Sequence, residues 1–194
     1  RQPGASYVVL MPNTRGFDRL EVCQKEGHGA DEIILMISSS QRHNLLNFRM
    51  DHAEAMREHA AIMKRAHALG IRVIGCAGTV YGCPVGGDIT TAEVAGVVRF
   101  YLEEGAQTIM LGDTTGVANP RLVRERVGEL MALFPGAEFI AHFHDTRGSG
   151  IANTLAMIEL GVRYVDCSIG AIGGQPATGA AKYSAGHTGN TCSE

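Results

Sequence analysis

The sequence predicts an α/β protein built as a (β/α)8 TIM barrel, here as an incomplete chain. Apolar, β-rich runs alternate with amphipathic helical patterns along all 194 residues, and the runs are nearly continuous in apolar residues, which is typical of parallel strands covered on both faces. Polar residues follow almost every run. The six expected strands are Tyr7–Met11, Glu32–Ile37, Arg72–Cys76, Thr108–Leu111, Phe139–Ala141 and Tyr164–Cys167.

Helical patterns occupy the segments between these runs, at roughly 14–26, 50–69, 91–105, 120–134 and 149–161. Thr90 with Glu93 predicts a capping box at one helix start. Asn119 followed by Pro120 predicts an N-cap with proline in the first helical position. Glycines stand where three helices are expected to end, at Gly70, Gly105 and Gly161. Six strands leave a barrel two strands short. We therefore expect one partial barrel domain over residues 1–194 that lacks the first strand or strands.

The position of the polar residues favours a barrel over a doubly wound sheet. In a barrel, every strand can contribute a group to one active-site rim, whereas a doubly wound sheet concentrates its ligand groups at one switch point. Neither a dinucleotide-binding nor a P-loop glycine motif is present. The rim residues are Asn13, Ser38–Ser40, Thr79, Cys83, Asp113, Thr114, His142, His144 and Ser168.

Composition indicates an ordinary globular protein. The formal net charge is −3 and 45% of residues are hydrophobic, so no basic face for nucleic acid or for an acidic membrane is expected. No apolar stretch is long enough for a membrane span. Five cysteines, an odd number without scaffold spacing, indicate a reducing compartment, and we expect a cytoplasmic protein.

His142 and His144 are the most informative pair in the chain. Side chains two apart on a strand point the same way, so both imidazoles should face the barrel mouth while Phe143 faces the helices. Two convergent neutral imidazoles suit a divalent metal, although a hydrogen-bonded pair without metal is the simpler alternative. Asp145 could orient an imidazole or cap the next helix.

Further metal ligands have to come from other strand ends or loops. His187 and Asn190 are both candidates, because an imidazole would suit Zn²⁺ and an amide oxygen would suit Mg²⁺ or Mn²⁺. Asp113 is the carboxylate best placed along the chain, although it could simply cap its loop. His52, His59 and His67 are spaced by seven and eight residues, which we interpret as one exposed helix face.

Taken together, these residues resemble the hydroxymethylglutaryl-CoA lyase family of metal-dependent (β/α)8-barrel enzymes. The resemblance covers nearly the whole chain in order, and the HFHDTRG block with the downstream GG loop is its most specific part. The motifs are PNTRGF (12–17), GCPVGG (82–87), LGDTTG (111–116), HFHDTRG (142–148), ANTL (152–155), GVRYVDCSIGAIGG (161–174) and GN (189–190).

The resemblance implies a cation, Mg²⁺ or Mn²⁺ in preference to Zn²⁺, bound by His142, His144 and Asn190. It also implies that the family's metal aspartate and a neighbouring arginine belong to the first barrel strand, outside this chain. Asp113 then becomes a catalytic polar group instead of a ligand. Asn13 and Thr114, on the same rim, are expected to bind substrate.

The implied reaction is carbon–carbon bond cleavage of an oxo-acid-lyase type. A tertiary hydroxy acyl-CoA resembling 3-hydroxy-3-methylglutaryl-CoA would yield acetyl-CoA and a keto acid. Gln175 stands where the lyases carry a catalytic cysteine, and an amide cannot exchange a proton as a thiol does. The alternatives are a Claisen-type synthase of the same superfamily and a metal- and CoA-binding protein without catalysis. The family also implies a homodimer that acts on a small molecule.

Overall fold

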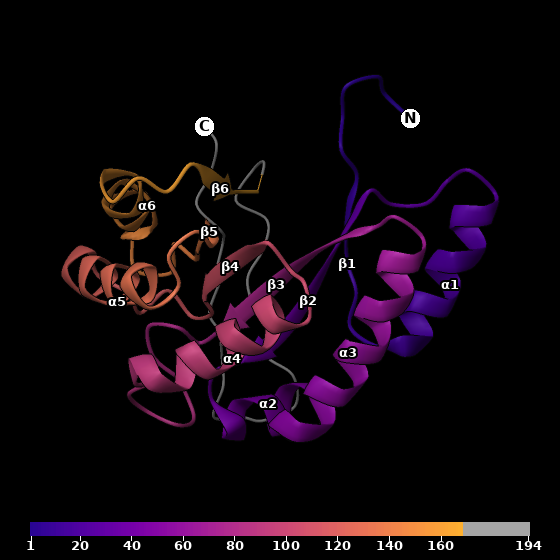
Figure 1. The fold of residues 1–194 in the computed structure, drawn as a ribbon. Coiled ribbons are helices and arrows are strands. Elements are labelled where there is room, and N and C mark those ends of the chain that lie inside the picture. The colour runs from indigo at the N-terminus through magenta and orange to yellow at the C-terminus, as the bar shows by residue number, and fades with distance from the viewer. Residues whose placement is uncertain (169–194) are drawn as a thin grey trace.

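The computed structural model describes residues 1–168. Its sheet has six parallel strands in the order β1-β2-β3-β4-β5-β6, each hydrogen-bonded to the next along the chain. The strands are β1 (Val8–Leu10), β2 (Glu32–Ser38), β3 (Arg72–Gly78), β4 (Thr108–Asp113), β5 (Glu138–Phe143) and β6 (Tyr164–Asp166). The sheet curls, and helices lie along its outer side (Figure 1). All six expected strands are confirmed, with ends shifted by one or two residues.

The helices also follow the expected alternation. They are α1 (Thr14–Lys25), α2 (Gln41–Phe48), α3 (His52–Ala68), α4 (Thr91–Glu103), α5 (Pro120–Leu133) and α6 (Gly150–Glu159). The capping box of Thr90 with Glu93 and the Asn119 cap are both present. Gly70, Gly105 and Gly161 all have positive φ, as helix-ending glycines should. Among the helices of the described residues, α2 alone was not predicted from the sequence, because it is short and largely polar.

Apolar side chains pack in two clusters, one on each face of the sheet. On β2, Ile33, Leu35 and Ile37 are fully buried in the main core between sheet and helices. The alternating residues Ile34 and Met36 face the other way and pack on a smaller cluster. That inner cluster consists of Ile74, Cys76, Met110 and Ile140. The two-residue period of a strand thus separates an outer core from the concave face of the curled sheet.

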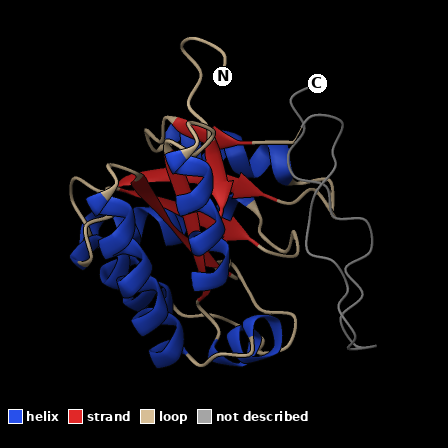
Figure 2. Ribbon diagram, turned by 90° about the vertical axis from the view of Figure 1, so that its right-hand side faces the viewer, coloured by secondary structure: helices blue, strands red, loops and turns tan. Residues whose placement is uncertain are grey.

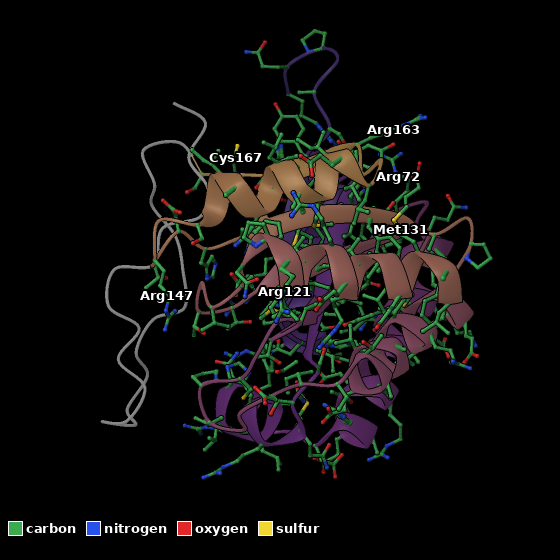
Figure 3. The ribbon with its side chains drawn as sticks, turned by 90° about the vertical axis from the view of Figure 1, so that its left-hand side faces the viewer. Arg72, Arg121, Met131, Arg147, Arg163 and Cys167 are labelled. Carbon is green, nitrogen blue, oxygen red and sulfur yellow. The ribbon has the colours of Figure 1, made fainter. Side chains whose placement is uncertain are left out.

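Figure 2 shows helices on more than one side of the strands, as expected for helices that wrap around a curled sheet. In Figure 3, Arg147 marks the end of the molecule that carries the loops after the strands, because Arg147 follows β5. Arg163, which lies just before β6, marks the opposite end. Since all strands run in parallel, every residue that follows a strand is brought to the same rim. Within residues 1–168, no helix has both the length and the apolar character that a membrane span requires.

One expectation is wrong. His59 is only 2% exposed, and its Nδ1 lies 2.9 Å from the Tyr101 hydroxyl in the interface between α3 and α4. Burial lowers the pKa of His59 to about 4, so it is a neutral core residue. His67 is exposed, as expected, and the His52 Nε2 atom lies 2.7 Å from the Ser38 carbonyl. The spacing of seven and eight does not place these three on one solvent-exposed face.

Candidate metal centre

His142 lies at the C-terminal end of β5, on the concave side of the sheet, and His144 follows directly after the strand. Phe143, between them, is fully buried in the outer core and packs against the Tyr81 ring, with centroids 5.4 Å apart. The predicted alternation is therefore confirmed. The Nε2 atoms of the two histidines lie 3.2 Å apart. Both imidazoles converge on one point, as a pair of metal ligands must.

The opposite ring nitrogens are both occupied by acceptors. His142 Nδ1 lies 2.5 Å from Asp166 Oδ2, across the β5–β6 pairing in which His142 stands opposite Asp166. His144 Nδ1 lies 2.6 Å from the Thr114 carbonyl oxygen. A carbonyl only accepts, so His144 Nδ1 donates to Thr114, and a neutral His144 imidazole then presents its Nε2 lone pair toward His142. At 3.2 Å the two Nε2 atoms are spaced for one cation bound by both or for one proton shared between them.

The electrostatics favour a neutral His144. Burial, followed by the nearby His142, lowers the pKa of His144, so the imidazole stays unprotonated at neutral pH. Neutral imidazole is the form that binds metal. Two nitrogens that bind one cation at about 2.1 Å lie roughly 3.0–3.5 Å apart, which the observed separation matches.

The described residues supply only part of a coordination shell. Within residues 1–168 no cluster of three or more His, Cys, Asp or Glu side chains is arranged to hold a metal ion. Asp166 contacts His142 Nδ1, the ring nitrogen that faces away from His144. Asp166 would therefore orient a ligand and would not itself coordinate the metal. The predicted third ligand, Asn190, lies outside the described residues, as do His187 and Gln175.

A polar network continues the site across the rim. Thr114 Oγ1 accepts from the Thr79 backbone N–H at 2.8 Å, and Thr79 Oγ1 lies 2.8 Å from Ser38 Oγ. Thr79 is fully buried with φ of 53°, a left-handed conformation that is strained for a β-branched residue. Polar contacts therefore run from β2 to β6, through Thr79, Thr114 and the two histidines. Thr114 contributes its carbonyl as well as its side chain.

Asp113 lies next to this network, but its carboxylate binds backbone N–H groups of the loop between β4 and α5. It is 1% exposed, and its carboxylate accepts from the backbone N–H groups of Val117 at 2.9 Å and Ala118 at 3.1 Å. Burial raises the pKa of Asp113 to about 6 despite these bonds. A raised carboxyl pKa in an active-site rim suits proton transfer, but both oxygens already serve the loop. Its catalytic role stays a prediction.

Other predicted residues have clear structural roles. Asn13 caps α1 by accepting from Gly16 N–H at 2.9 Å. Asp145 accepts from Gly150 N–H at 2.6 Å and so holds the start of α6. Asn13 as a substrate contact stays a prediction. The contact of Asp166 with His142 was not predicted from the sequence, although Asp166 lies at the end of the sixth strand, where site residues are expected.

Comparisons with known proteins agree with this architecture. The family model described as HMGL-like matches residues 5–194. Human mitochondrial hydroxymethylglutaryl-CoA lyase is 34% identical over 192 residues, covering 99% of this chain and 56% of that protein. The Bacillus subtilis hydroxymethylglutaryl-CoA lyase YngG is 32% identical over 194 residues, covering all of this chain and 61% of YngG. The chain thus spans little more than half the length of these relatives.

Solved structures are similar over the same span. A hydroxymethylglutaryl-CoA lyase from Pseudomonas aeruginosa superposes with a TM-score of 0.88 at 30% identity, covering 100% of this chain and 61% of that one. An HMG-CoA lyase from Acinetobacter baumannii, in complex with coenzyme A and 3-methylmalate, gives 0.86 at 36% identity, covering 99% and 59%. The predicted barrel architecture is therefore confirmed, with six parallel strands in a curled half-barrel. The chain belongs to the HMGL-like family.

Proposed function

We propose that the full-length protein is a metal-dependent carbon–carbon lyase acting on a tertiary hydroxy acyl-CoA. The observation that carries this proposal is the pair of converging Nε2 atoms, each with its Nδ1 already bound to an acceptor. Family membership supplies the reaction class, and the Acinetobacter structure with coenzyme A and 3-methylmalate supports an acyl-CoA or hydroxy-acid substrate. A homodimer and a cytoplasmic location stay predictions.

His142 and His144 would hold the cation, with Asn190 proposed as a third ligand. A bound Mg²⁺ or Mn²⁺ would supply Lewis-acid polarisation of the substrate hydroxyl and carboxylate oxygens. Two groups of this chain would align the imidazoles: the Asp166 carboxylate from β6, which accepts from His142 Nδ1, and the Thr114 carbonyl directly after β4, which accepts from His144 Nδ1. Oxygen ligands such as an amide favour Mg²⁺ or Mn²⁺ over Zn²⁺.

The cleavage requires two proton movements. The hydroxyl of the substrate loses its proton to a base, and the carbonyl that forms expels the acyl-CoA fragment as an enolate. That fragment must then gain a proton at carbon to leave as acetyl-CoA. Asp113, with a pKa raised to about 6 by burial, is the proposed acid–base group among the described rim residues. Gln175 cannot supply the second proton, so water or another side chain has to do so.

The test is a cleavage assay on the full-length protein. Metal-stripped enzyme would be given Mg²⁺ or Mn²⁺ with hydroxymethylglutaryl-CoA, and acetyl-CoA would be followed. We expect metal-dependent cleavage in the wild type and none in His142→Ala. Turnover that persists in metal-free buffer would contradict the proposal. Metal binding without turnover would reject this substrate, and other hydroxy acyl thioesters would then be assayed.

A further inference from the structure

The loop between β4 and α5 offers three successive carbonyl oxygens to one neighbouring segment. Thr114 O accepts from His144 Nδ1 at 2.6 Å. The next two carbonyls, those of Thr115 and Gly116, both accept from Arg147 Nη1 at 3.0 Å. His144 and Arg147 belong to the same loop after β5. Two side chains three residues apart therefore hold three consecutive peptide groups of the facing loop.

The two loops pack closely enough to require glycine at position 116. Gly116 has φ of 64°, and a Cβ there would lie 2.7 Å from the His144 carbonyl oxygen and 2.8 Å from Thr146 Oγ1. Both the conformation and the lack of space exclude a larger residue. This contact brings the loop backbone against the very segment that carries His144.

Other contacts also fix parts of this loop: the Gly116 N–H donates to the Asp113 carbonyl at 3.2 Å, and Thr114 Oγ1 accepts from the Thr79 N–H at 2.8 Å. Asp113 binds the Val117 and Ala118 N–H groups, and Asn153 Nδ2 donates to the Ala118 carbonyl at 3.2 Å. Among the hydrogen bonds of the described residues, Arg147 alone binds the carbonyls of 115 and 116, directly after the carbonyl that orients His144.

We propose that Arg147 is a positioning residue for the histidine pair. By binding the Thr115 and Gly116 carbonyls, Arg147 fixes the orientation of the preceding peptide. The Thr114 carbonyl then holds the His144 proton on Nδ1 and turns Nε2 toward His142. The inference rests on the proposed function, because the purpose of this alignment is to bind a cation.

Arg147 suits a direct test because its side chain is exposed. Arg147→Met keeps the length of the side chain but removes every donor, and Arg147→Lys keeps a donor without the planar fork. Arg121, on the neighbouring α5, is a matched control, since within residues 1–168 its 86%-exposed side chain makes a loose ion pair with Glu125 at 3.8 Å and no closer one. Figure 3 shows both arginines.

The first measurement is Mn²⁺ affinity of the full-length protein by calorimetric titration. Arg147→Met should weaken binding about tenfold, as is typical when an outer-shell partner is lost. Arg147→Lys should fall between Arg147→Met and wild type, and Arg121→Met should match wild type. Lyase activity of Arg147→Met should recover at saturating Mn²⁺. Equal affinity in Arg147→Met and wild type would overturn the inference.

The second measurement needs no metal and separates this inference from the proposed function. Ring ¹⁵N chemical shifts of His144 report which nitrogen carries the proton. We expect the Nδ1–H tautomer to dominate in wild type and Arg121→Met, and the two tautomers to mix in Arg147→Met. An unchanged tautomer in Arg147→Met would contradict the positioning role. Wild-type protein that binds no Mn²⁺ would overturn the proposed function, and the tautomer result would still decide whether Arg147 orients His144.

Discussion

His142 and His144 differ in what holds their second ring nitrogen. His142 Nδ1 faces the Asp166 carboxylate, whereas His144 Nδ1 faces the neutral Thr114 carbonyl. A carboxylate behind an imidazole raises its basicity and strengthens its bond to a cation more than a carbonyl does. As proposed metal ligands, the two histidines are therefore unequal. We expect His142 to contribute more to metal affinity than His144 does.

Asp166 should consequently be essential for tight metal binding. Asp166→Asn replaces an anionic acceptor by a neutral amide and should lower Mn²⁺ affinity about 10- to 100-fold. The melting temperature of the metal-free protein should change little, because Asp166 is partly exposed. Calorimetric titration of both proteins checks this. Asp88→Asn, at an exposed loop position, is the control, and an affinity unchanged in Asp166→Asn would refute the role.

Substitution of Asp113 separates its structural role from a catalytic one. Asp113→Ala leaves the Val117 and Ala118 N–H groups without their acceptor and should lower the free energy of unfolding by about 2 kcal/mol. Asp113→Asn keeps one accepting oxygen and should cost less. Urea unfolding measures both. If Asp113→Asn keeps stability and Mn²⁺ affinity but loses turnover, the catalytic prediction is supported; full turnover would reject it.

At the scale of elements, α3 and α4 meet through a buried polar pair. His59 from α3 and the Tyr101 hydroxyl from α4 lie 2.9 Å apart, and Tyr101 is fully buried. An unprotonated imidazole can share this hydrogen bond without a buried charge. Protonation of His59 would place an imidazolium in the core, where Glu58 offsets only part of the burial effect on its pKa.

Stability should therefore fall in acid through His59. Burial lowers its folded pKa to about 4, below its ordinary value of 6.5, so the unfolded chain takes up the proton first. The contribution is complete above pH 6.5 and is lost as the pH falls toward 4, up to about 3 kcal/mol. Urea unfolding of wild type and His59→Gln across this range measures it. Parallel pH profiles would contradict the assignment.

Helix α5 holds the loop between β3 and α4 through a buried arginine. Arg126 donates from Nη1 to the Val80 carbonyl at 2.7 Å and from Nη2 to the Ile89 carbonyl at 2.6 Å. The two acceptors stand near opposite ends of the loop. One planar side chain therefore joins both ends of this rim segment to the helix that follows the next strand.

Loss of Arg126 should loosen this loop selectively. Arg126→Met removes the donors to two buried carbonyls and should cost about 1–3 kcal/mol of stability. Amide hydrogen exchange should accelerate within residues 80–89 before it does in β3 or β4. Arg121→Met, on the same helix, is the control. Uniform acceleration over the whole chain would indicate global destabilisation and would refute a local clamp.

For the molecule as a whole, the order of the strands and the place of the rim were predictable from sequence. Continuous apolar runs predict buried parallel strands, and parallel strands bring all following residues to one end. The alternation along β5 likewise predicts that Phe143 and the histidines face opposite sides. These properties depend on local periodicity, which a single sequence carries.

The rest depends on contacts between distant segments. Asp166 is 24 residues from His142, and their pairing follows from the β5–β6 register, which no local pattern encodes. The burial of His59 depends on how α4 packs on α3. Helix α2 was missed because QRHNLLNF has little apolar periodicity, and its start is set by the Ser40 side chain, which accepts from the His43 N–H at 3.3 Å.

The central claim is that His142 and His144 bind one cation through Nε2. The most direct measurement is electron spin echo envelope modulation of Mn²⁺ bound to the full-length protein, which detects directly coordinated imidazole nitrogen. We predict coupling to two nitrogens in wild type and to one in His144→Ala. Bound Mn²⁺ without nitrogen coupling in wild type would contradict the claim.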